Sequence, residues 1–186
     1  MIGVYDNFPA IRHGAVIFSC KSETLELQKT ILFLLQSLNE QNEPLKLPEF
    51  AKKNIHVKMD VGVADGITFN YFDLECLKCC LKEVSNNALH TLDLFFIIRY
   101  YLINGAKSRP LKFDYYIIRF LFRENTVELL VYHDKGPRHL AVEEMIKFLF
   151  NKINHELQSK QMSPLILVSI RSVGSDELGG DDWLKL

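Results

Sequence analysis

The sequence predicts an α+β fold with a mixed, mostly antiparallel sheet and three helices. Three aromatic and aliphatic runs follow one another between residues 91 and 134, and turn-forming residues separate them: FFIIRYY from Phe95, YYIIRFL from Tyr115 and VELLVYH from Val127. Apolar and polar residues alternate from Ile55 to Val63, as in a half-buried strand. Three other segments carry apolar residues at helical spacing. The three runs predict an antiparallel meander at the centre of the sheet, and their near-continuous apolarity predicts strands that are covered on both faces.

The first 53 residues predict a lead-in, one strand and one helix. Residues 1–13 show no period, and Phe8-Pro9 disfavours a helix there. Residues 15–20 form a short apolar run that predicts the first strand. Ser22 follows at the position of a helix N-cap, and an apolar helical period continues to about Glu40. Asn42, Pro44 and Pro48 then predict the end of the helix and a linker.

A hairpin, a second helix and the central strands come next. Asp65-Gly66 follows the alternating strand and predicts a hairpin turn, because this dipeptide tolerates positive φ. Residues 67–72 are the predicted return strand. Asp73 is placed to cap a helix that runs from Leu74 to about residue 84.

The last third predicts a loop, a long helix and a final strand. Residues 134–139 form the loop, and the inward face of the helix runs from Leu140 to Leu157. Ser163-Pro164 ends the helix, and residues 165–170 are the last predicted strand. The predicted order is β-α-β-β-α-β-β-β-α-β, whose first six elements resemble a ferredoxin-like start. Hairpin, helix and strand occur twice, in residues 55–103 and 111–171, so an internal duplication is a topological hypothesis.

Composition indicates one domain over residues 1–173 and an acidic, mobile tail over residues 174–186. Hydrophobic residues make up 48% of the chain, but Asp93 and Arg99 interrupt the densest apolar run, which is too short to span a bilayer. The N-terminus lacks the pattern of a secretory signal. We therefore expect a cytoplasmic protein that is not embedded in a membrane, with its four cysteines reduced.

Charge is distributed unevenly along the chain. The net charge of −1 combines a tail of −3 with a remainder of +2, and the segment from residue 99 to residue 123 is distinctly basic. Basic side chains interleaved with tyrosines on a sheet can hold phosphates and stack bases. The candidate nucleic-acid-binding residues are Arg99, Tyr101, Lys107, Arg109, Lys112, Arg119 and Arg123. The alternative is that Arg99 and Arg119 pair with Asp93, Asp114 or Glu128 and that the tyrosines lie in the core.

The loop before the long helix is a candidate anion-binding site. Free backbone N–H groups and the helix dipole attract anions at a helix start. Lys135, Gly136, Arg138 and His139 are the residues that would take part. The alternative is ordinary helix capping by a glycine-proline loop, since the segment lacks a P-loop or dinucleotide-binding pattern.

Signals for metal and catalytic chemistry are weak. Cys76, Cys79 and Cys80 lack a second ligand pair at zinc spacing, and Cys76 and Cys80 share the apolar face of the predicted helix. We therefore predict no metal and no cofactor. His133 and Asp134, with Arg138 nearby, could act as an acid–base pair, but no motif places a nucleophile beside them.

The tail ends in Trp183-Leu184-Lys185-Leu186, which includes the only tryptophan. Trp183, Leu184 and Leu186 are candidates for docking to a partner or to the protein's own surface. The tail resembles, in type only, the acidic tails of single-stranded DNA-binding proteins.

We expect a non-enzymatic binding or adaptor protein associated with nucleic acid through its basic sheet region and anion-binding loop. The tail would recruit a partner or mask the protein's own surface. Two alternatives stay open. One is a small enzyme that acts on a phosphorylated substrate near His133, Asp134 and Arg138. The other is a structural subunit that pairs with a protein partner or with a second copy of itself.

Overall fold

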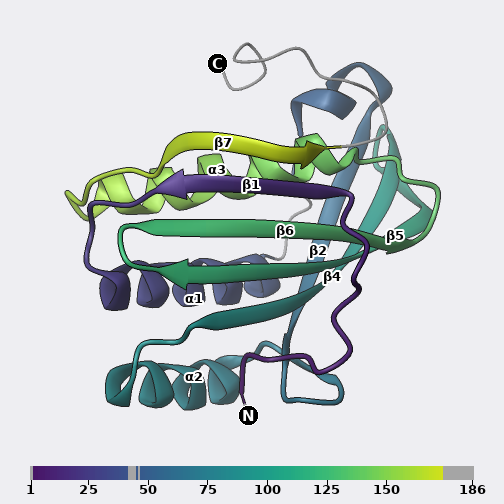
Figure 1. The fold of residues 1–186 in the computed structure, drawn as a ribbon. Coiled ribbons are helices and arrows are strands. Elements are labelled where there is room, and N and C mark those ends of the chain that lie inside the picture. The colour runs from purple at the N-terminus through teal and green to yellow at the C-terminus, as the bar shows by residue number, and fades with distance from the viewer. Residues whose placement is uncertain (1, 42–44, 46, 174–186) are drawn as a thin grey trace.

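A computed structural model describes residues 2–41, 45 and 47–173 of the chain. It contains a seven-stranded sheet with three α-helices on one face (Figure 1). The elements in chain order are β1 (Gly14–Ser19), α1 (Thr24–Glu40), the 3-10 helix η1 (Pro48–Lys53), β2 (Ile55–Ala64), β3 (Phe69–Tyr71), α2 (Leu74–Asn86), β4 (Thr91–Asn104), β5 (Lys107–Arg123), β6 (Thr126–Lys135), α3 (Val142–Ser159) and β7 (Ile166–Val173).

The strands lie in the order β3-β2-β4-β5-β6-β1-β7, and every pairing between these strands is antiparallel. β4, β5 and β6 form a meander, with β5 in the middle of the sheet. The predicted α+β class, the order of elements and the central position of the aromatic runs are therefore confirmed. Each predicted element is present, although its ends differ by a few residues.

The core lies between the helices and one face of the sheet. Alternate residues of each strand point towards the helices, as the period of two requires. These residues are buried together with the apolar faces of the helices: Val16, Phe18, Val61, Leu94, Phe96, Ile98, Ile118, Phe120, Leu129, Leu27, Ile31, Leu35, Met145, Leu149 and Ile153.

The other face of the sheet carries no helix, so the prediction that the central strands are covered on both faces is wrong for the part of this face that stays open. Residues 2–13, which we call the N-terminal strap, cross this open face instead (Figure 1). Gly3 donates its N–H to the carbonyl oxygen of Ala64 at 2.7 Å and accepts the N–H of Asp93 at 2.7 Å. The lead-in was predicted to be irregular, and its apolar and aromatic side chains cover part of what a second layer of helices would cover.

Amide side chains tie the helices to strand edges and loops. Gln28 of α1 bonds both the N–H and the carbonyl oxygen of Leu89, at 2.9 and 2.7 Å. Asn39, also on α1, does the same for Val61 of β2 at 2.6 and 2.9 Å. The Asn39 bonds lie along β2 beyond the end of β3, and the Gln28 bonds lie at Leu89, before β4 begins, so both supply partners to backbone groups where strand pairing is missing.

Strand pairing departs from both topological hypotheses. β4 returns beside β2, whereas β7 pairs with β1, so the two hairpin–helix–strand units are not arranged alike. β1 lies apart from β2, with β4, β5 and β6 between them, so the ferredoxin-like order of elements does not produce a split βαβ unit.

Two local details also differ from prediction. The N-cap of α1 is Glu23, not Ser22, and the Ser22 hydroxyl donates instead to the carbonyl oxygen of Ser163 at 3.0 Å. The return strand β3 is only three residues long, because residues 65–68 are used in the turn. Asp73 caps α2 as predicted, and its carboxylate accepts the N–H of Cys76 at 2.9 Å.

Candidate nucleic-acid interface

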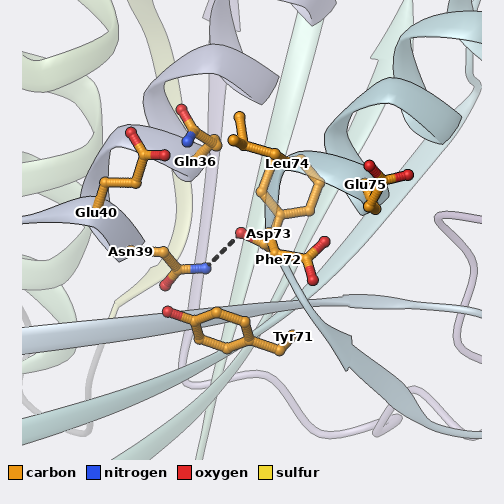
Figure 2. A pocket seen from close by; sticks show the side chains of 8 residues that line it. All are labelled: Gln36, Asn39, Glu40, Tyr71, Phe72, Asp73, Leu74 and Glu75. Atoms are coloured by element: carbon orange, nitrogen blue, oxygen red, sulfur yellow. Dashed lines mark hydrogen bonds between the residues drawn. The ribbon is translucent and has the colours of Figure 1, made fainter.

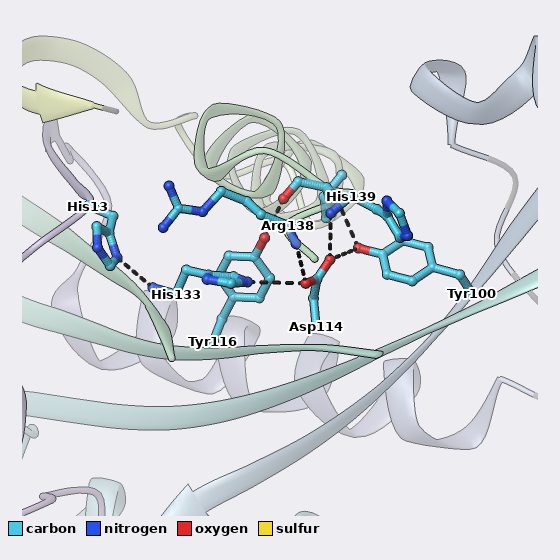
Figure 3. Close-up of polar contacts among 8 residues, drawn as sticks. His13, Tyr100, Asp114, Tyr116, His133, Arg138 and His139 are labelled. Carbon is cyan, nitrogen blue, oxygen red and sulfur yellow. Dashed lines mark hydrogen bonds and ion pairs between the residues drawn. The ribbon is translucent and has the colours of Figure 1, made fainter. Parts of the chain in front are cut away.

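The loop of residues 135–139 folds around a buried carboxylate of the same chain. Asp114 of β5 is fully buried and accepts the backbone N–H groups of Arg138 and His139 at 2.6 and 2.7 Å. It also accepts the Tyr100 hydroxyl at 2.7 Å and lies 3.1 Å from Nε2 of His133 (Figure 3). The backbone donors that the sequence suggested for an external anion are thus already bonded to Asp114, and an external anion would have to contact the side chains of the loop.

Tight packing around Asp114 explains the glycine in this loop. Gly136 has a φ of 115°, and a Cβ at this position would lie 2.9 Å from the Cα of Asp114. Side chains do not approach backbone atoms so closely, and φ in this range is costly for residues with a Cβ. The glycine is therefore required by the contact with β5.

Hydrogen bonding keeps the Asp114 carboxyl ionised. Burial alone would raise its pKa, but the hydrogen bonds from Tyr100, His133 and the two backbone N–H groups outweigh burial, so the pKa lies below its usual value. The pKa of Tyr100 is raised by burial and by its bond to Asp114, and burial also raises the pKa of Tyr116. Tyr116 donates to the carbonyl oxygen of Leu140, so both phenols hold the loop in place.

The candidate acid–base residues do not converge on one point. His133 is 7% exposed and its ring faces Asp114. Asp134 is exposed, because it is the extra residue of a β-bulge in β6. The Arg138 side chain extends away from Asp114 towards His13 (Figure 3). His133 is therefore held as part of the buried polar cluster.

A row of aromatic rings crosses the open face of the sheet. Tyr5 of the strap lies 4.7 Å from Phe69 of β3, which lies 5.3 Å from Phe95 of β4. Phe95 lies 5.9 Å from Tyr115 of β5, where all distances join ring centroids. The Lys135 ammonium ends the row 4.7 Å from the Tyr115 centroid. We call Tyr5, Phe69, Phe95 and Tyr115 the aromatic ladder; all four side chains are half-buried.

Gly62 lets the ladder pass over β2. It pairs directly with Phe95 in β4, and a Cβ at Gly62 would lie 3.3 Å from the Cβ of Phe69. The absence of a side chain there allows Phe69 to reach Phe95 across the intervening strand.

The two arginines inside the central strands differ in how completely their guanidinium groups are bonded within the protein and in how exposed they are. Arg119 donates from Nε and Nη2 to the two carboxylate oxygens of fully buried Asp93, both at 2.6 Å. Phe8 of the strap covers the Arg119 guanidinium at 4.1 Å. Arg99 forms an ion pair with Asp60, with Nε 2.6 Å from Oδ2, but the angle lies outside hydrogen-bond geometry. The Arg99 side chain is 41% exposed and lies 5.9 Å from the Phe113 ring, so it is accessible on the open face.

The end of β4 and the start of β5 form a basic hairpin, residues 99–113, which extends past β2 after Leu102 and past β6 before Tyr115. Lys107, Arg109 and Lys112 are exposed in it and form no ion pair with any residue that the structure describes. Tyr101 is half-buried and pairs with His56 and Pro110. The hairpin therefore concentrates unpaired positive charge at one end of the sheet.

A hollow of about 550 Å³ joins the hairpin, the ladder and the loop. It is lined by Leu111, Lys112, Phe113, Tyr115, Gly136 and Pro137. We call it the hairpin hollow. Phe113 is 40% exposed, and Tyr115 brings the end of the ladder to the same place. The hollow thus offers aromatic surfaces beside the lysines at positions 112 and 135.

The sequence candidates are only partly brought together. Arg99, Tyr101, Lys107, Arg109 and Lys112 belong to the basic hairpin, and Lys135 and Gly136 border the ladder or the hollow. Arg119 is bonded to Asp93, and Arg123 lies at the far end of β5, 3.8 Å from Glu128. Arg138 and His139 are exposed, but their backbone N–H groups are occupied. Trp183, Leu184 and Leu186 lie outside the described residues.

Sequence reasoning missed Asp114 as the organiser of the loop and missed Phe69 and Phe95 as surface residues. The alternation of side chains along β5 could have indicated Asp114. Asp114 and Arg119 are an odd number of positions apart, so their side chains point to opposite faces of the sheet. The link from Phe69 to Phe95 required the register of β2, which sequence alone does not supply.

The cysteines are free thiols. Cys80 is fully buried, and burial strongly raises its pKa, while Cys79 is exposed. Within the described part of the chain, no three histidine, cysteine or acidic side chains are arranged to hold a metal ion. None of the helices in that part is both long and apolar enough to cross a membrane.

Comparison with protein-family models gave no match, and comparisons with curated proteins and with solved structures gave no significant match.

Proposed function

We propose that the open face at the hairpin end binds single-stranded nucleic acid. The observation that carries this proposal is the aromatic ladder, which crosses the uncovered face and ends at Lys135 and the hairpin hollow. Aromatic rings on an exposed sheet face stack unpaired bases, and neighbouring cations hold the phosphates. The fold alone would support many functions, so the proposal depends on this surface.

Bases would stack on the rings that border the hollow. Phe113 is exposed at 40%, and Tyr115 presents a half-buried ring beside it. The Tyr115 ring already contacts Phe95, which fixes its position, and a base would stack on it in place of the Lys135 ammonium, which could then contact a phosphate.

Phosphates would contact the basic hairpin. Lys107, Arg109 and Lys112 have no acidic partner among the described residues, so their charge is not neutralised within the fold. Arg99 retains exposed guanidinium surface despite its ion pair with Asp60. Neutralising phosphates releases counterions, so binding should weaken steeply as salt rises.

A single strand suits this surface better than a duplex. The bases of a duplex are stacked on one another and cannot lie on protein rings, whereas those of a single strand can be splayed. The strap covers the far part of the open face through Phe8 and His13, so the accessible part is the end that carries the hairpin.

Fluorescence anisotropy tests the proposal with labelled oligo(dT) and oligo(U) of about 15 nucleotides, against a duplex of equal length, over a series of salt concentrations. We expect the single strands to bind more tightly, with an affinity that falls as salt rises. Tyr115→Ala should weaken binding by about tenfold, the order expected for loss of one stacked base. A circular dichroism melt checks that each variant is folded.

Phe33→Ala is the matched control. Phe33 is 47% exposed on α1, on the helical side, and it also lies beneath a lysine, with Lys160 Nζ 5.5 Å from its ring. This substitution should leave affinity unchanged. Lys107 is exposed, so Lys107→Gln should leave the fold intact. This substitution should weaken binding of the single strand and reduce the salt dependence of that binding. Failure of the unaltered protein to bind any single strand at low salt would overturn the proposal.

A further inference from the structure

A second hollow lies beside the end of β3, between the end of α1 and the start of α2. Its volume is about 270 Å³, and its lining includes Gln36 and Glu40 from α1, Tyr71 at the end of β3 and Leu74 at the start of α2 (Figure 2). This volume is below the range usual for drug-sized ligands, and it suits a single side chain. We call it the α1–α2 hollow.

One largely buried residue that lines this hollow has an amide without a partner among the residues that the structure describes. Gln36 is 9% exposed, and its side chain forms no hydrogen bond in the described part of the chain. The other buried polar side chains of α1 are bonded: Gln28 to Leu89 and Thr30 to the carbonyl oxygen of Glu26. Asn39, which also lines the hollow, uses its amide on Val61 and Phe72. The amide atoms of Gln36 reach the solvent of the hollow and have no partner among the described residues, so both are free to bond a ligand there.

The hollow favours positive charge. Gln36 and Glu40 lie four residues apart on one face of α1, so a ligand can contact both. Glu40 is exposed, forms no ion pair with a described residue, and ends a helix whose last turn has no basic residue. The negative end of the helix dipole adds to its charge. Asp73 and Glu75 border the hollow at the start of α2, where their charges offset the positive end of that helix dipole.

The walls suit a planar cation. Tyr71 is 55% exposed, and its ring offers a face for a cation–π contact. Leu74 is 54% exposed beside it, which leaves apolar surface around the mouth of the hollow. Arginine stacks on aromatic faces and donates several hydrogen bonds in one plane, so it can reach an amide oxygen and a carboxylate together.

We infer that the α1–α2 hollow binds an arginine side chain of a protein partner, with Gln36 and Glu40 accepting its N–H groups and Tyr71 stacking against it. Apolar residues next to that arginine would cover Leu74 and the rest of Tyr71, which is why a protein is the expected source rather than a free small cation. The α1–α2 hollow and the hairpin hollow share no lining residue, so either proposal can fail without the other.

NMR with the full ¹⁵N-labelled chain tests the inference. The probe is the blocked tripeptide acetyl-Ala-Arg-Ala-amide, and its control is the same peptide with citrulline, which has the same shape but no charge. The arginine peptide should shift the side-chain N–H₂ signals of Gln36 and the backbone signal of Leu74, and saturate at millimolar concentration. The citrulline peptide should cause little change. Equal shifts with both peptides, or no shift at Gln36, would overturn the inference.

Two variants and one further probe separate the remaining outcomes. Glu40→Gln should weaken binding of the arginine peptide about three- to fivefold, the range of an exposed charge pair. Glu75→Gln is the matched control, because Glu75 is exposed and pairs with Lys78 at 3.0 Å, and it should change affinity less. Spermidine, a free polyamine, should bind more weakly than the peptide. Tighter binding of spermidine at Gln36 would contradict a protein source.

Discussion

Asp114 accepts the backbone N–H of Arg138 at 2.6 Å, so a carboxylate from the central strand occupies the place where an external anion could have bound. The N–H of His139 and the Tyr100 hydroxyl bond to the same carboxylate. Since these donors belong to different parts of the chain, the carboxylate fixes the loop of residues 135–139 against β5. The position of Lys135 and the shape of the hairpin hollow depend on this arrangement.

Removal of the Asp114 carboxylate should strongly destabilise the protein. Asp114→Ala leaves the Tyr100 hydroxyl, the His133 ring and two backbone N–H groups without their acceptor in a buried region. We expect the free energy of unfolding to fall by about 3 kcal/mol or more, measured by urea denaturation. Asp134→Asn is the control, because Asp134 is exposed, and it should change stability by less than about 0.5 kcal/mol. Similar losses for both variants would contradict the role given to Asp114.

Stability should also fall with acid through Asp114. Although burial opposes ionisation, the surrounding hydrogen bonds lower its pKa in the folded protein relative to about 3.9 in the unfolded chain. The unfolded state therefore takes up the proton first as pH falls. This contribution is present above pH about 4 and is lost as pH falls through the lower, folded value. Urea denaturation at a series of pH values should show a shallower acid slope for Asp114→Asn than for the unaltered protein.

Replacing either of two glycines with positive φ by alanine should destabilise the protein, but by different amounts. Gly136 has a φ of 115°, and its added Cβ would meet the backbone of Asp114, whereas Gly105 has a φ of 59° and open space around it. Gly105→Ala should cost about 1 kcal/mol from backbone strain alone. Gly136→Ala should cost several times more, because the loop must also move. Equal shifts in melting temperature would mean that the close contact at Gly136 is readily relieved.

The central strands could be predicted from sequence because their apolar runs are long and turn residues separate them. The same pattern could not identify which face is open. Phe95 on the open face and Phe96 on the helical face are adjacent identical residues, and only burial separates them, half-buried against fully buried. The strap that covers Arg119 is irregular, so no periodicity predicts where it lies.

Sequence alone could predict that the basic residues of the hairpin are exposed. It could not predict the acidic partner of an arginine when that partner lies on a neighbouring strand. Lys107, Arg109 and Lys112 are exposed as expected of a basic hairpin. Arg99 was expected to pair with Asp93, Asp114 or Glu128, but its partner is Asp60, because β2 lies beside β4 in a register that local sequence does not specify. Arg119 does pair with one of the three expected acids, Asp93, which is directly opposite it.

Loss of Arg119 should be more damaging than loss of Arg99. Arg119→Met leaves the fully buried carboxylate of Asp93 without its cation and removes the bond to the Tyr5 carbonyl oxygen in the strap. We expect a loss of about 3–5 kcal/mol, as for other broken buried ion pairs. Arg99→Met should cost less, because Arg99 is 41% exposed and Asp60 retains 13% exposure, whereas Asp93 is fully buried. Chemical denaturation of both variants at neutral pH measures the difference, and a larger loss for Arg99→Met would contradict it.

Acid should loosen the end of the strap through His13. Its Nδ1 accepts the backbone N–H of His133 at 2.9 Å, which requires the neutral ring, and its ring stacks on Tyr132. Burial, then the charge of Arg138 and that of His133, lower the pKa of His13 below about 6.5. A histidine with a lowered pKa stabilises the fold above the unfolded value, and that contribution is lost as pH falls through the folded value.

NMR titration of the His13 ring protons should therefore give a lower midpoint in the folded protein than in the same chain unfolded in urea. The backbone signal of His133 should shift with the same midpoint, because protonation removes its acceptor. His13→Gln should abolish that shift while leaving the Asp114 contacts intact. The strap covers part of the open face. Its release in acid would therefore also expose more of that face beside Tyr115. An unchanged His133 signal across the His13 titration would show that the strap is held by other contacts alone.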